Sequence, residues 1–488
     1  MSRKILSWFG LALFTVLLSF TVRSNAIADT PKHYTNLEFE PLPDIELPEY
    51  QRYELDNGMV VYLVEDRDLP LISGTAIIRT GSRFEPANKI GLAELTGALM
   101  RSGGTENHSP AELNTILEQK AAGIETSIEK SAGIAEFSTL TEDLETVFPL
   151  FTEVLRQPAF APKQLAIAKN QQQGSIARRN DDPAAIAERE FNKVLYGKTS
   201  PYARTIEYET LNNISRQDAI DFYQTYVHPE NIILGIVGDF TSDRMIERIE
   251  NAFGNWQVDT DNPVAALEAP TATQQQDGGI FAIDRPQQTQ SNILLGHIGG
   301  RFDSPDYPTL SVLNGVLNGF GGRLFNQVRS RQGLAYSVYA AWNPDYDYDG
   351  IFIAGGQTQT NSTVPFIQSV TNEIKKLRNQ PVTEQELANA KESILNSFVF
   401  NFQNPSQTLS RLMRYEYFDY PQDFIFTYQD KVQNTTREDI LNAAQKYLLP
   451  NRLVTVVVGN VKAMNPPLGN LEQEVSLVDV SVPQPAKS

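Results

Sequence analysis

A guanidinium and a phenol stand seven residues apart at Arg329 and Tyr336. Both side chains donate hydrogen bonds, and Arg keeps its charge at any pH at which proteins fold. Such a pair can hold a polarised carbonyl oxygen between its two donors. Judged from spacing alone, a surface Arg at a helix end and a Tyr packed on a sheet are the simpler interpretation.

The segment from Gly321 to Trp342 must position this pair. Apolar residues fall at helical spacing up to Val328, and Gly333 follows as a helix stop. The residues from 336 onward are rich in the strand formers Tyr, Val and Trp. A helix that ends at this glycine and continues as a strand brings the guanidinium and the phenol onto one wall.

A short glycine-rich run, Gly319, Gly321 and Gly322, precedes this helix. It lacks the Lys-Ser/Thr of a P-loop, so it is not a phosphate cradle. Two interpretations stay open: a tight turn into the helix, which is the simpler, and a substrate-binding loop.

The histidines and cysteines give metal chemistry little support. The chain has no Cys, and its four His residues are scattered far apart along the sequence: His33, His108, His228 and His297. No pair therefore has the helical spacing of two zinc ligands. We interpret the third of them as a structural residue and the second as a solvated residue in a polar loop.

Two groups of acidic residues also have a structural interpretation. The first group is predicted to line a solvated strand face rather than to bind metal: Glu125, Glu129 and Glu136. The second group alternates with Pro and Tyr, and no Glu closes a calcium loop, so a hairpin turn is predicted there: Asp345, Asp347 and Asp349.

The periodicity of the chain predicts strands in runs and helices in runs, which indicates an α+β fold. Strands are expected at 52–65 (a hairpin turning at Asp56-Asn57-Gly58), 71–80, 124–141, 232–237, 281–285, 292–299, 336–342, 351–355 and 454–458. Helices are expected at 90–101, 110–122 (opened by Ser109), 142–156, 163–180, 183–195, 215–227, 309–317, 364–378, 384–400 and 438–448. Residues 258–278 are expected to be a polar linker, and residues 465–488 a disordered, Pro-rich tail.

The two halves on either side of this linker repeat each other. Arg216, Asp218, Gln224, Tyr226, Pro229 and Gly238 recur 221 positions later as Arg437, Asp439, Gln445, Tyr447, Pro450 and Gly459. The run from Gly81 to Glu85 recurs 218 positions later, from Gly299 to Asp303. Matches at nearly one offset, near both ends of each half, argue for a duplication.

Composition and the N-terminus predict an exported protein. At 488 residues, with 41% hydrophobic and 20% charged residues, the chain is long enough for two domains. Residues 1–28 have a basic start, an apolar run and a small-residue site at Ala26-Ile27-Ala28, as in a secretory signal; an uncleaved anchor is the alternative. We expect a periplasmic mature chain that begins at Asp29, with an extended arm over 29–47.

Charge argues against nucleic acid and anionic lipid surfaces as partners. The full chain has a net charge of −18, and loss of three basic residues with the signal leaves −21. Such a chain is compatible with basic or unfolded polypeptides and is repelled by polyanions.

The segment Arg323-Leu-Phe, Arg329 and Gly333-Leu-Ala-Tyr336 closely resembles the C-terminal half of M16 zinc peptidases, the pitrilysin, insulinase and mitochondrial processing peptidase family. The resemblance covers about residues 48 to 462. It implies two homologous domains of the LuxS/MPP-like metallopeptidase type, 48–257 and 279–464, with mixed or antiparallel sheets and helices, facing each other across a cavity. It also implies that Arg329 and Tyr336 point into a zinc site.

The first half departs from the family pattern at the zinc site. The family motif is His-x-x-Glu-His on a helix, with a Glu further along as third ligand. At the matching positions this chain has Glu94, Gly97, Ala98 and, in the third-ligand region, Ser175. One carboxylate replaces three ligands and a base, so no zinc is expected in this chain and no autonomous peptidase activity.

The resemblance therefore implies a non-catalytic subunit of an exported heterodimeric zinc endopeptidase. A partner subunit would carry the zinc, and Arg329 and Tyr336 would bind the substrate peptide and stabilise the oxyanion at the partner's site. Two alternatives stay open: an inert peptide-binding or scaffold protein of the same fold, and an active metallopeptidase with unusual ligands. Homo- or hetero-oligomerisation is also undecided by the sequence.

Overall fold

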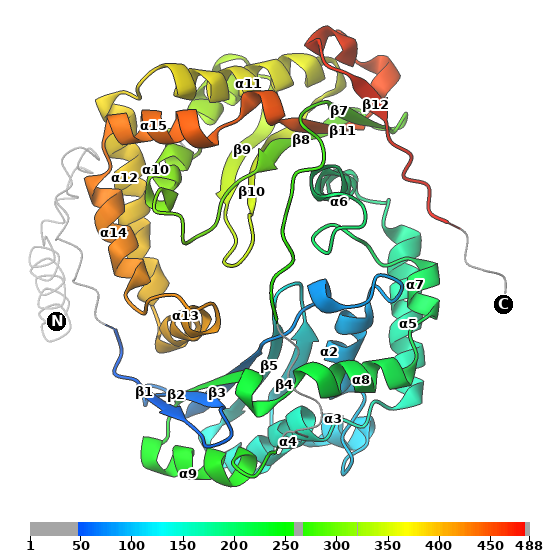
Figure 1. Cartoon of the computed structure of the whole chain (residues 1–488), viewed down its shortest axis with the longest axis vertical. Coiled ribbons are helices and arrows are strands. Elements are labelled where there is room, and N and C mark those ends of the chain that lie inside the picture. The colour runs from blue at the N-terminus through cyan, green and yellow to red at the C-terminus, as the bar shows by residue number, and fades with distance from the viewer. Residues whose placement is uncertain (1–46, 258–266, 320, 484–488) are drawn as a thin grey trace, which may run out of the picture. The chain divides into compact units, whose positions relative to one another are not determined.

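The computed structural model describes residues 47–257, 267–319 and 321–483 of the chain. The predicted signal and all but the last residue of the predicted arm lie outside these residues. Within the described ranges, no helix is long and apolar enough to cross a membrane. The described residues build two halves of helices and strands, each with one six-stranded mixed sheet, in agreement with the predicted two-domain fold (Figure 1).

The sheet of the first half is mixed and has the order β1-β2-β6-β3-β5-β4. Strands β2 and β6 run parallel, and every other neighbouring pair is antiparallel. The predicted hairpin turn is confirmed at Gly58, whose φ of 84° suits glycine. The strands are β1 (Gln51–Glu54), β2 (Val60–Glu65), β3 (Leu71–Ile78), β4 (Gly123–Ile128), β5 (Gly133–Leu140) and β6 (Ile232–Gly238).

Helices cover one face of this sheet and enclose the core of the first half. Helix α4 shows why: Val147, Phe151 and Val154 repeat at helical spacing and are fully buried. The predicted start of α3 is confirmed, because Ser109 and Glu112 form a capping box. The helices are α2 (Leu92–Ser102), α3 (Pro110–Gln119), α4 (Leu144–Arg156), α5 (Pro162–Arg178), α6 (Pro183–Tyr196), α7 (Tyr208–Asn212), α8 (Arg216–Tyr226) and α9 (Ser242–Phe253).

The sheet of the second half has the equivalent order β12-β7-β11-β8-β10-β9. Its parallel pair, β7 with β11, corresponds to β2 with β6, which confirms the duplication seen in the sequence. Only the outermost strand differs, since β12 pairs parallel with β7 whereas β1 pairs antiparallel with β2. The strands are β7 (Ile280–Asp284), β8 (Gln290–Ile298), β9 (Ala335–Asn343), β10 (Ile351–Gln359), β11 (Val454–Gly459) and β12 (Val475–Leu477).

The helices of the second half include two that the sequence analysis missed, α13 and α14. Helix α13 could have been found through the duplication, since its first residue, Pro405, matches Pro183, the first residue of α6, at nearly the offset of the other repeated residues. The helices are α10 (Tyr307–Leu317), α11 (Thr363–Asn379), α12 (Glu384–Phe398), α13 (Pro405–Tyr417), α14 (Phe424–Asn434) and α15 (Arg437–Tyr447).

Each half lends one helix to the other half's sheet (Figure 1). Helix α6 packs on β8 and β11 of the second sheet, where Phe191 joins Leu294 and Ile353 in one cluster. Helix α13 packs on β6 of the first sheet, where Leu409 and Met413 join a cluster of that sheet's inner face. Each sheet is therefore covered by its own helices on one face and by a helix of the opposite half on the other.

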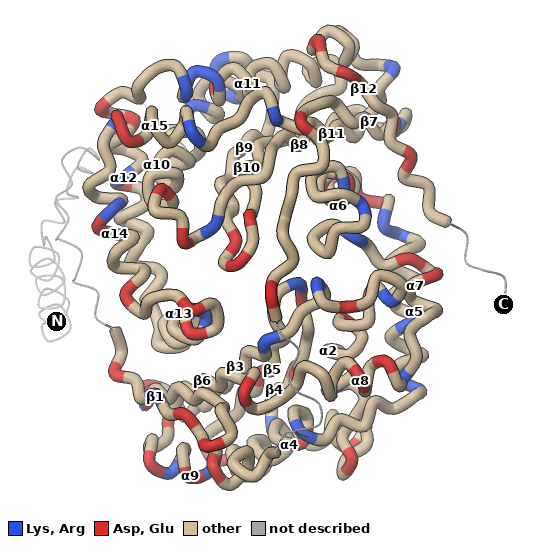
Figure 2. The backbone as a smooth tube through the Cα atoms, viewed as in Figure 1, with Lys and Arg blue, Asp and Glu red and all other residues tan. Residues whose placement is uncertain are grey.

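The β9–β10 hairpin is a second link between the halves. The Asp347 carboxylate pairs with the buried Arg83 guanidinium at 2.7 Å, and the Tyr348 ring stacks on Tyr202 with centroids 4.0 Å apart. Figure 2 shows the acidic tip of this hairpin beside the first half. The predicted hairpin turn at Asp345–Asp349 is confirmed. Its Asp347 forms an ion pair across the interface between the halves.

The predicted disorder of residues 465–488 is wrong for the part that the structure describes. Residues up to Pro483 are placed, and β12 pairs with β7 through backbone bonds such as Val478 N to Ala282 O, 2.9 Å. Pairing at a sheet edge uses backbone groups that every residue but Pro offers in full, so a sequence without periodicity can still form a strand. The described part of the predicted linker, 267–278, has no helix or strand.

Candidate functional site

The helix that carries Arg329 is a π-helix, Phe325–Arg331, where the sequence predicts an ordinary helix. Its widened turn shows in the bond from Gln332 N to Gln327 O, 3.2 Å, which spans five residues. It ends before Gly333, whose φ of 62° lies in the left-handed region. Turns of this type are rare and occur often at functional sites, because they move side chains out of α-helical register.

The structure brings Arg329 and Tyr336 together. The guanidinium carbon lies 5.4 Å from the centre of the Tyr336 ring and 5.0 Å from the centre of the Phe325 ring. Tyr336 is the second residue of the edge strand β9 and is 80% exposed. Contact with two aromatic rings restrains the cation while leaving its N–H groups able to donate. Across the described residues, Arg329 takes part in no ion pair.

An ion pair that the sequence analysis missed anchors the start of this segment. Arg323 Nε and Nη2 donate to the two oxygens of Glu386, at 2.7 and 3.0 Å. Glu386 also completes the capping box of α12 with Thr383. The Arg323 hydrogen bond holds the pKa of Glu386 down to about 2. The Arg323–Glu386 ion pair ties the start of the segment that carries the π-helix to α12. The Arg323-Leu-Phe motif was the feature of the sequence that could have pointed to it.

The glycine-rich run forms a turn. Gly319 has a φ of 81°, and Gly322 N donates to its carbonyl oxygen at 3.1 Å. A Cβ on Gly322 would lie 2.0 Å from the carbonyl oxygen of Asn318, so no larger residue fits there. Gly321 is exposed and accepts a hydrogen bond from Asn326. This geometry accounts for the glycines as a turn, and their role as a substrate-binding loop stays a prediction.

The four positions of the degenerate zinc motif do not fit a zinc ion. Glu94 on α2 accepts a hydrogen bond from Gln172 on α5, and the Ser175 hydroxyl donates to the Gln171 carbonyl. The described ranges hold no cluster of three or more His, Asp or Glu that could bind a metal. With one carboxylate and no imidazole at these positions, the ligands that zinc requires are missing.

The position of the family's general base is closed by backbone packing. A Cβ on Gly97 would lie 2.3 Å from the Ile128 nitrogen, so α2 and strand β4 approach closely enough to exclude any side chain. Thr126 Oγ1 donates to the Gly97 carbonyl at 2.6 Å and holds this approach. The loss of the base is therefore built into the helix–strand contact of this chain.

Two of the three described histidines make polar contacts with their rings, and the third is buried. His297 is fully buried and donates from Nδ1 to the Ile298 carbonyl, and burial lowers its pKa to about 4. His228 is buried, which agrees with its structural interpretation. The interpretation of His108 as merely solvated is wrong, since its Nδ1 lies 2.8 Å from a Glu153 oxygen. His33 lies outside the described residues.

The acidic strand face appears as the sequence predicts. Glu125 and Glu136 stand opposite each other on β4 and β5, and both are exposed. Glu129, at the end of the same hairpin, is exposed as well. Like charges placed directly across a ladder destabilise it slightly, and exposure to water keeps the effect small.

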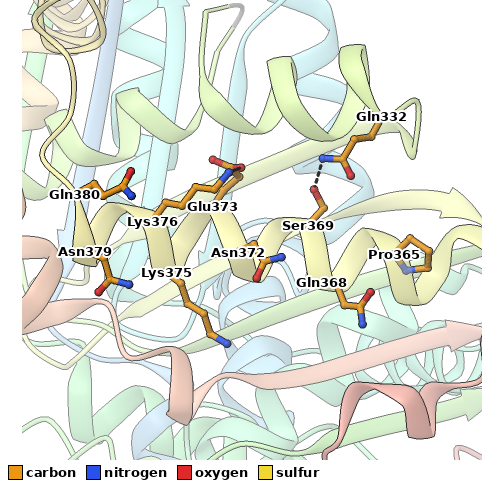
Figure 3. Close-up of a pocket in the computed structure, with 10 residues that line it drawn as sticks. All are labelled: Gln332, Pro365, Gln368, Ser369, Asn372, Glu373, Lys375, Lys376, Asn379 and Gln380. Carbon is orange, nitrogen blue, oxygen red and sulfur yellow. Dashed lines mark hydrogen bonds and ion pairs between the residues drawn. The ribbon is translucent and has the colours of Figure 1, made fainter.

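Two hollows flank the π-helix and strand β9. One, of about 450 Å³, lies along α11, where Gln332 Nε2 donates to Ser369 Oγ at 2.9 Å (Figure 3). Its lining is polar and includes neither Arg329 nor Tyr336. The other, of about 780 Å³, lies between α6 and the inner face of β8, β9 and β10, and Ser337 and Tyr339 contribute to it.

Comparisons with known proteins agree with this picture. Residues 73–208 match the family model described as insulinase (peptidase family M16), and residues 213–394 match the model described as peptidase M16 inactive domain. A relative from Bacillus subtilis, an uncharacterized zinc protease YmxG, is 24% identical over 74% of this chain and 86% of its own length. A relative from Helicobacter pylori, described as the non-peptidase homolog YmxG, is 24% identical over 84% of this chain and 94% of its own.

Solved structures show the same fold. The crystal structure of a peptidase M16 inactive domain from Pseudomonas fluorescens matches with a TM-score of 0.75 and 24% identity, over 84% of this chain and 98% of that one. A protease from Helicobacter pylori matches with a TM-score of 0.73 and 19% identity, over 84% and 100%.

Proposed function

Because this chain belongs to the M16 peptidase family and lacks the family's zinc ligands, we propose that it is the non-catalytic subunit of an exported heterodimeric zinc endopeptidase. The partner subunit, a related chain with an intact His-x-x-Glu-His, carries the zinc. This chain, in the periplasm after loss of its signal, supplies Arg329 and Tyr336 to the partner's substrate.

The observation that carries the proposal is the pairing of Arg329 with Tyr336 at an exposed place. The cation lies 5.4 Å from the Tyr336 ring, and that ring is 80% exposed. Burial or ion pairing would explain a purely structural Arg, and neither is found for Arg329 among the described residues. An exposed, restrained pair of donors instead suits an external acceptor.

The chemistry asked of the pair is electrostatic. As the peptide carbonyl becomes tetrahedral, its oxygen gains negative charge, and a guanidinium and a phenol can both donate to it. Arg presents its N–H groups in a planar fork and does not lose its proton, so the donor is ready before the charge develops. Such donors act mainly on turnover, since their bonds strengthen in the transition state.

Turnover of the reconstituted pair of subunits tests the proposal. Arg329→Ala and Tyr336→Phe should each reduce turnover roughly a hundred- to a thousandfold, the usual effect of losing one oxyanion donor. Arg329→Lys should rescue little, because an ammonium does not reproduce the planar fork.

Arg331→Ala is the matched control, because Arg331 is an exposed Arg of the same helix whose Nη1 donates to Gln327 Oε1 at 3.4 Å. It should leave turnover unchanged. Zinc content and assembly, measured by metal analysis and size-exclusion chromatography, should be the same for every variant. Variants at Arg329 and Tyr336 that assemble and turn over at the wild-type rate would rule the proposal out.

A catalytically inert peptide-binding or scaffold protein is the second candidate. The closed packing at Gly97 and the hollow between α6 and β9 favour it, since neither requires a zinc-bearing partner. The same reconstitution separates the two, because a scaffold subunit would assemble without any dependence of turnover on Arg329.

A further inference from the structure

Strand β9 contains a β-bulge at Tyr336. Ser337 pairs with Gln357 of β10, and the next pair along the ladder joins Ala335 with Thr358. Tyr336 lies between these pairs and therefore has no partner of its own on β10. A bulge adds one residue to one strand and changes the direction of its side chain, and bulges occur often beside functional sites. This bulge carries the phenol of the proposed site.

The bulge removes Tyr336 from the apolar core. Val338, Ala340 and Trp342 alternate along β9 and pack on the core between the second sheet and its own helices. Regular alternation would place the Tyr336 side chain in the same row. Ala335 packs against this core instead, and Tyr336 is 80% exposed. The extra residue thus brings the phenol to the surface.

The first half has no equivalent of this bulge among its described strands. Its corresponding ladder, β4 with β5, keeps a regular register from Gly123, opposite Ser138, to Ile128, opposite Gly133. The two sheets share the order of these strands, so the fold does not require a bulge here. The bulge belongs to the half that carries the two donors.

A buried hydroxyl group holds the bulge from the side of β10. Thr358 is 2% exposed, and its Oγ1 donates to the carbonyl oxygen of Leu334, two residues before Tyr336. Leu334 N donates to the carbonyl oxygen of Val328 in the π-helix, at 3.0 Å. On its other side Thr358 pairs with Ser291 of β8, so it is fixed within the sheet. The hydroxyl therefore fixes the chain where it leaves the helix and enters the bulge.

A separate contact holds the side of the π-helix. Gln332 Nε2 donates to the buried Ser369 Oγ of α11 at 2.9 Å (Figure 3). The helix also packs against β9 and α11. The segment that carries Arg329 is therefore anchored without Thr358. Loss of the Thr358 hydrogen bond should displace Tyr336 and leave the helix in place.

We propose that Thr358 is a positioning residue for the proposed site: its hydroxyl holds the bulge that keeps the Tyr336 phenol beside the Arg329 guanidinium. Because its side chain is buried, it acts through the backbone of Leu334. The inference rests on the proposed function, since it concerns the placement of the same two donors. A misplacement of about 1 Å can slow catalysis about a hundredfold, so a group that fixes this placement has a measurable effect on turnover.

Fluorine NMR of the single chain tests the placement. A fluorinated tyrosine, incorporated only at Tyr336, reports the surroundings of that ring. Arg329→Ala should shift its signal, because the cation lies 5.4 Å from the ring centre. Thr358→Val removes the hydroxyl at nearly constant shape and should also shift the signal, whereas Thr358→Ser keeps the hydroxyl and should show the wild-type signal. An unchanged signal in Thr358→Val would overturn the inference.

Turnover with the zinc-bearing partner tests the consequence for catalysis. Thr358→Val should lower kcat roughly tenfold and leave KM nearly unchanged, because the donors act mainly in the transition state. Thr358→Ser should restore most of the wild-type kcat. A serine variant as slow as the valine variant would show that the hydroxyl is not the cause, and the inference would be wrong.

Thr139→Val is the matched control in the first half. Thr139 of β5 corresponds to Thr358 of β10 at nearly the offset of the other repeated residues, and both are 2% exposed. Thr139→Val should leave the fluorine signal and kcat at their wild-type values. If it slows turnover as much as Thr358→Val does, the effect comes from lost stability and the inference is overturned. Thermal melting checks that each variant is folded, and Thr358→Cys, whose thiol donates only weakly, replaces a valine variant that does not fold.

The two measurements separate this inference from the proposed function. If Arg329→Ala and Tyr336→Phe do not lower turnover, the proposed function fails, and the fluorine signal still decides whether Thr358 places the ring. If they lower turnover while Thr358→Val keeps the wild-type signal or the wild-type rate, the proposed function stands and the inference is wrong.

Discussion

The two halves of this molecule share the order of five of their six strands and differ in the features that bear on function. In the first half, helix α2 sits so close to β4 that Gly97 admits no side chain. In the second half, the segment beside edge strand β9 is widened into a π-helix that displays Arg329. One half has no room for a side chain at the position of the family's general base, whereas the other half has an exposed guanidinium and an exposed phenol.

The two helices that cover the opposite half's sheet, α13 and α6, also differ. Leu409 of α13 is buried in the cluster that covers the first sheet, and Ala187 occupies the equivalent position of α6, counted from the proline that begins each helix. The smaller residue leaves part of the second sheet open as the hollow of 780 Å³. The two halves share their architecture, and a single side chain on the covering helix distinguishes the sheet that keeps an open hollow.

The largest effect is expected where duplicated residues have different neighbours. Arg83 is buried and pairs with Asp347 of the other half, whereas its counterpart in the duplication, Arg301, is exposed and pairs with Asp303. Arg83→Ala should lower the free energy of unfolding by about 3 kcal/mol, because the partly buried Asp347 carboxylate loses its partner. Arg301→Ala should cost less than about 1 kcal/mol. Denaturant titration measures both losses of stability. Equal losses would contradict the role of the Arg83–Asp347 ion pair as a link between the halves.

The next effect concerns the closed contact at Gly97. Gly97→Ala should destabilise the fold by about 2 kcal/mol, since its Cβ would meet β4 backbone at 2.3 Å and force α2 away. The Cβ of the equivalent Gly315→Ala would come no closer than 3.1 Å to its surroundings, at the Ala390 Cβ, and the helical preference of Ala offsets that contact. Thermal melting of the two variants compares the halves directly. A neutral Gly97→Ala would show that the base position is less closed than we infer.

A smaller, pH-dependent effect should come from Glu386. Its folded pKa, about 2, lies below the ordinary value of 4.5, so it adds stability above that value and loses it as the pH falls toward 2. Because the side chain is partly exposed, we expect about 1–2 kcal/mol. Wild type should therefore lose more stability between pH 6 and pH 3 than Glu386→Gln, by urea titration. Parallel curves for the two proteins would exclude the Arg323 anchor.

The smallest effects should be equal in the two halves. Ser215 with Asp218 caps α8, and Thr436 with Asp439 caps the equivalent α15 through the same capping box. Ser215→Ala and Thr436→Ala should each cost about 1 kcal/mol. A clear difference between the two losses, measured by denaturant titration, would mean that the duplicated caps are not equivalent.

The sequence by itself determined most of the element types, the duplication and the loss of the zinc ligands. Helical and alternating periodicity report which face of a segment is apolar, and Ser109 and Gly58 mark ends and turns by local backbone chemistry. The closeness of Arg329 and Tyr336 also followed from sequence, because only seven residues and one glycine separate them. These features are local, so short windows of sequence contain them.

Only the tertiary structure decided the features that depend on distant partners. The patterns of α6 and α13 show an apolar face and do not say that each covers the other half's sheet. Arg83 and Arg301 have nearly the same neighbours in sequence, yet one is buried against Asp347 and the other is exposed. The π-helical turn packs against β9 and α11, and strand β12 pairs with an edge of β7; neither feature leaves a periodic signal. Packing between residues far apart in the sequence determines these partners, and no short window of sequence encodes them.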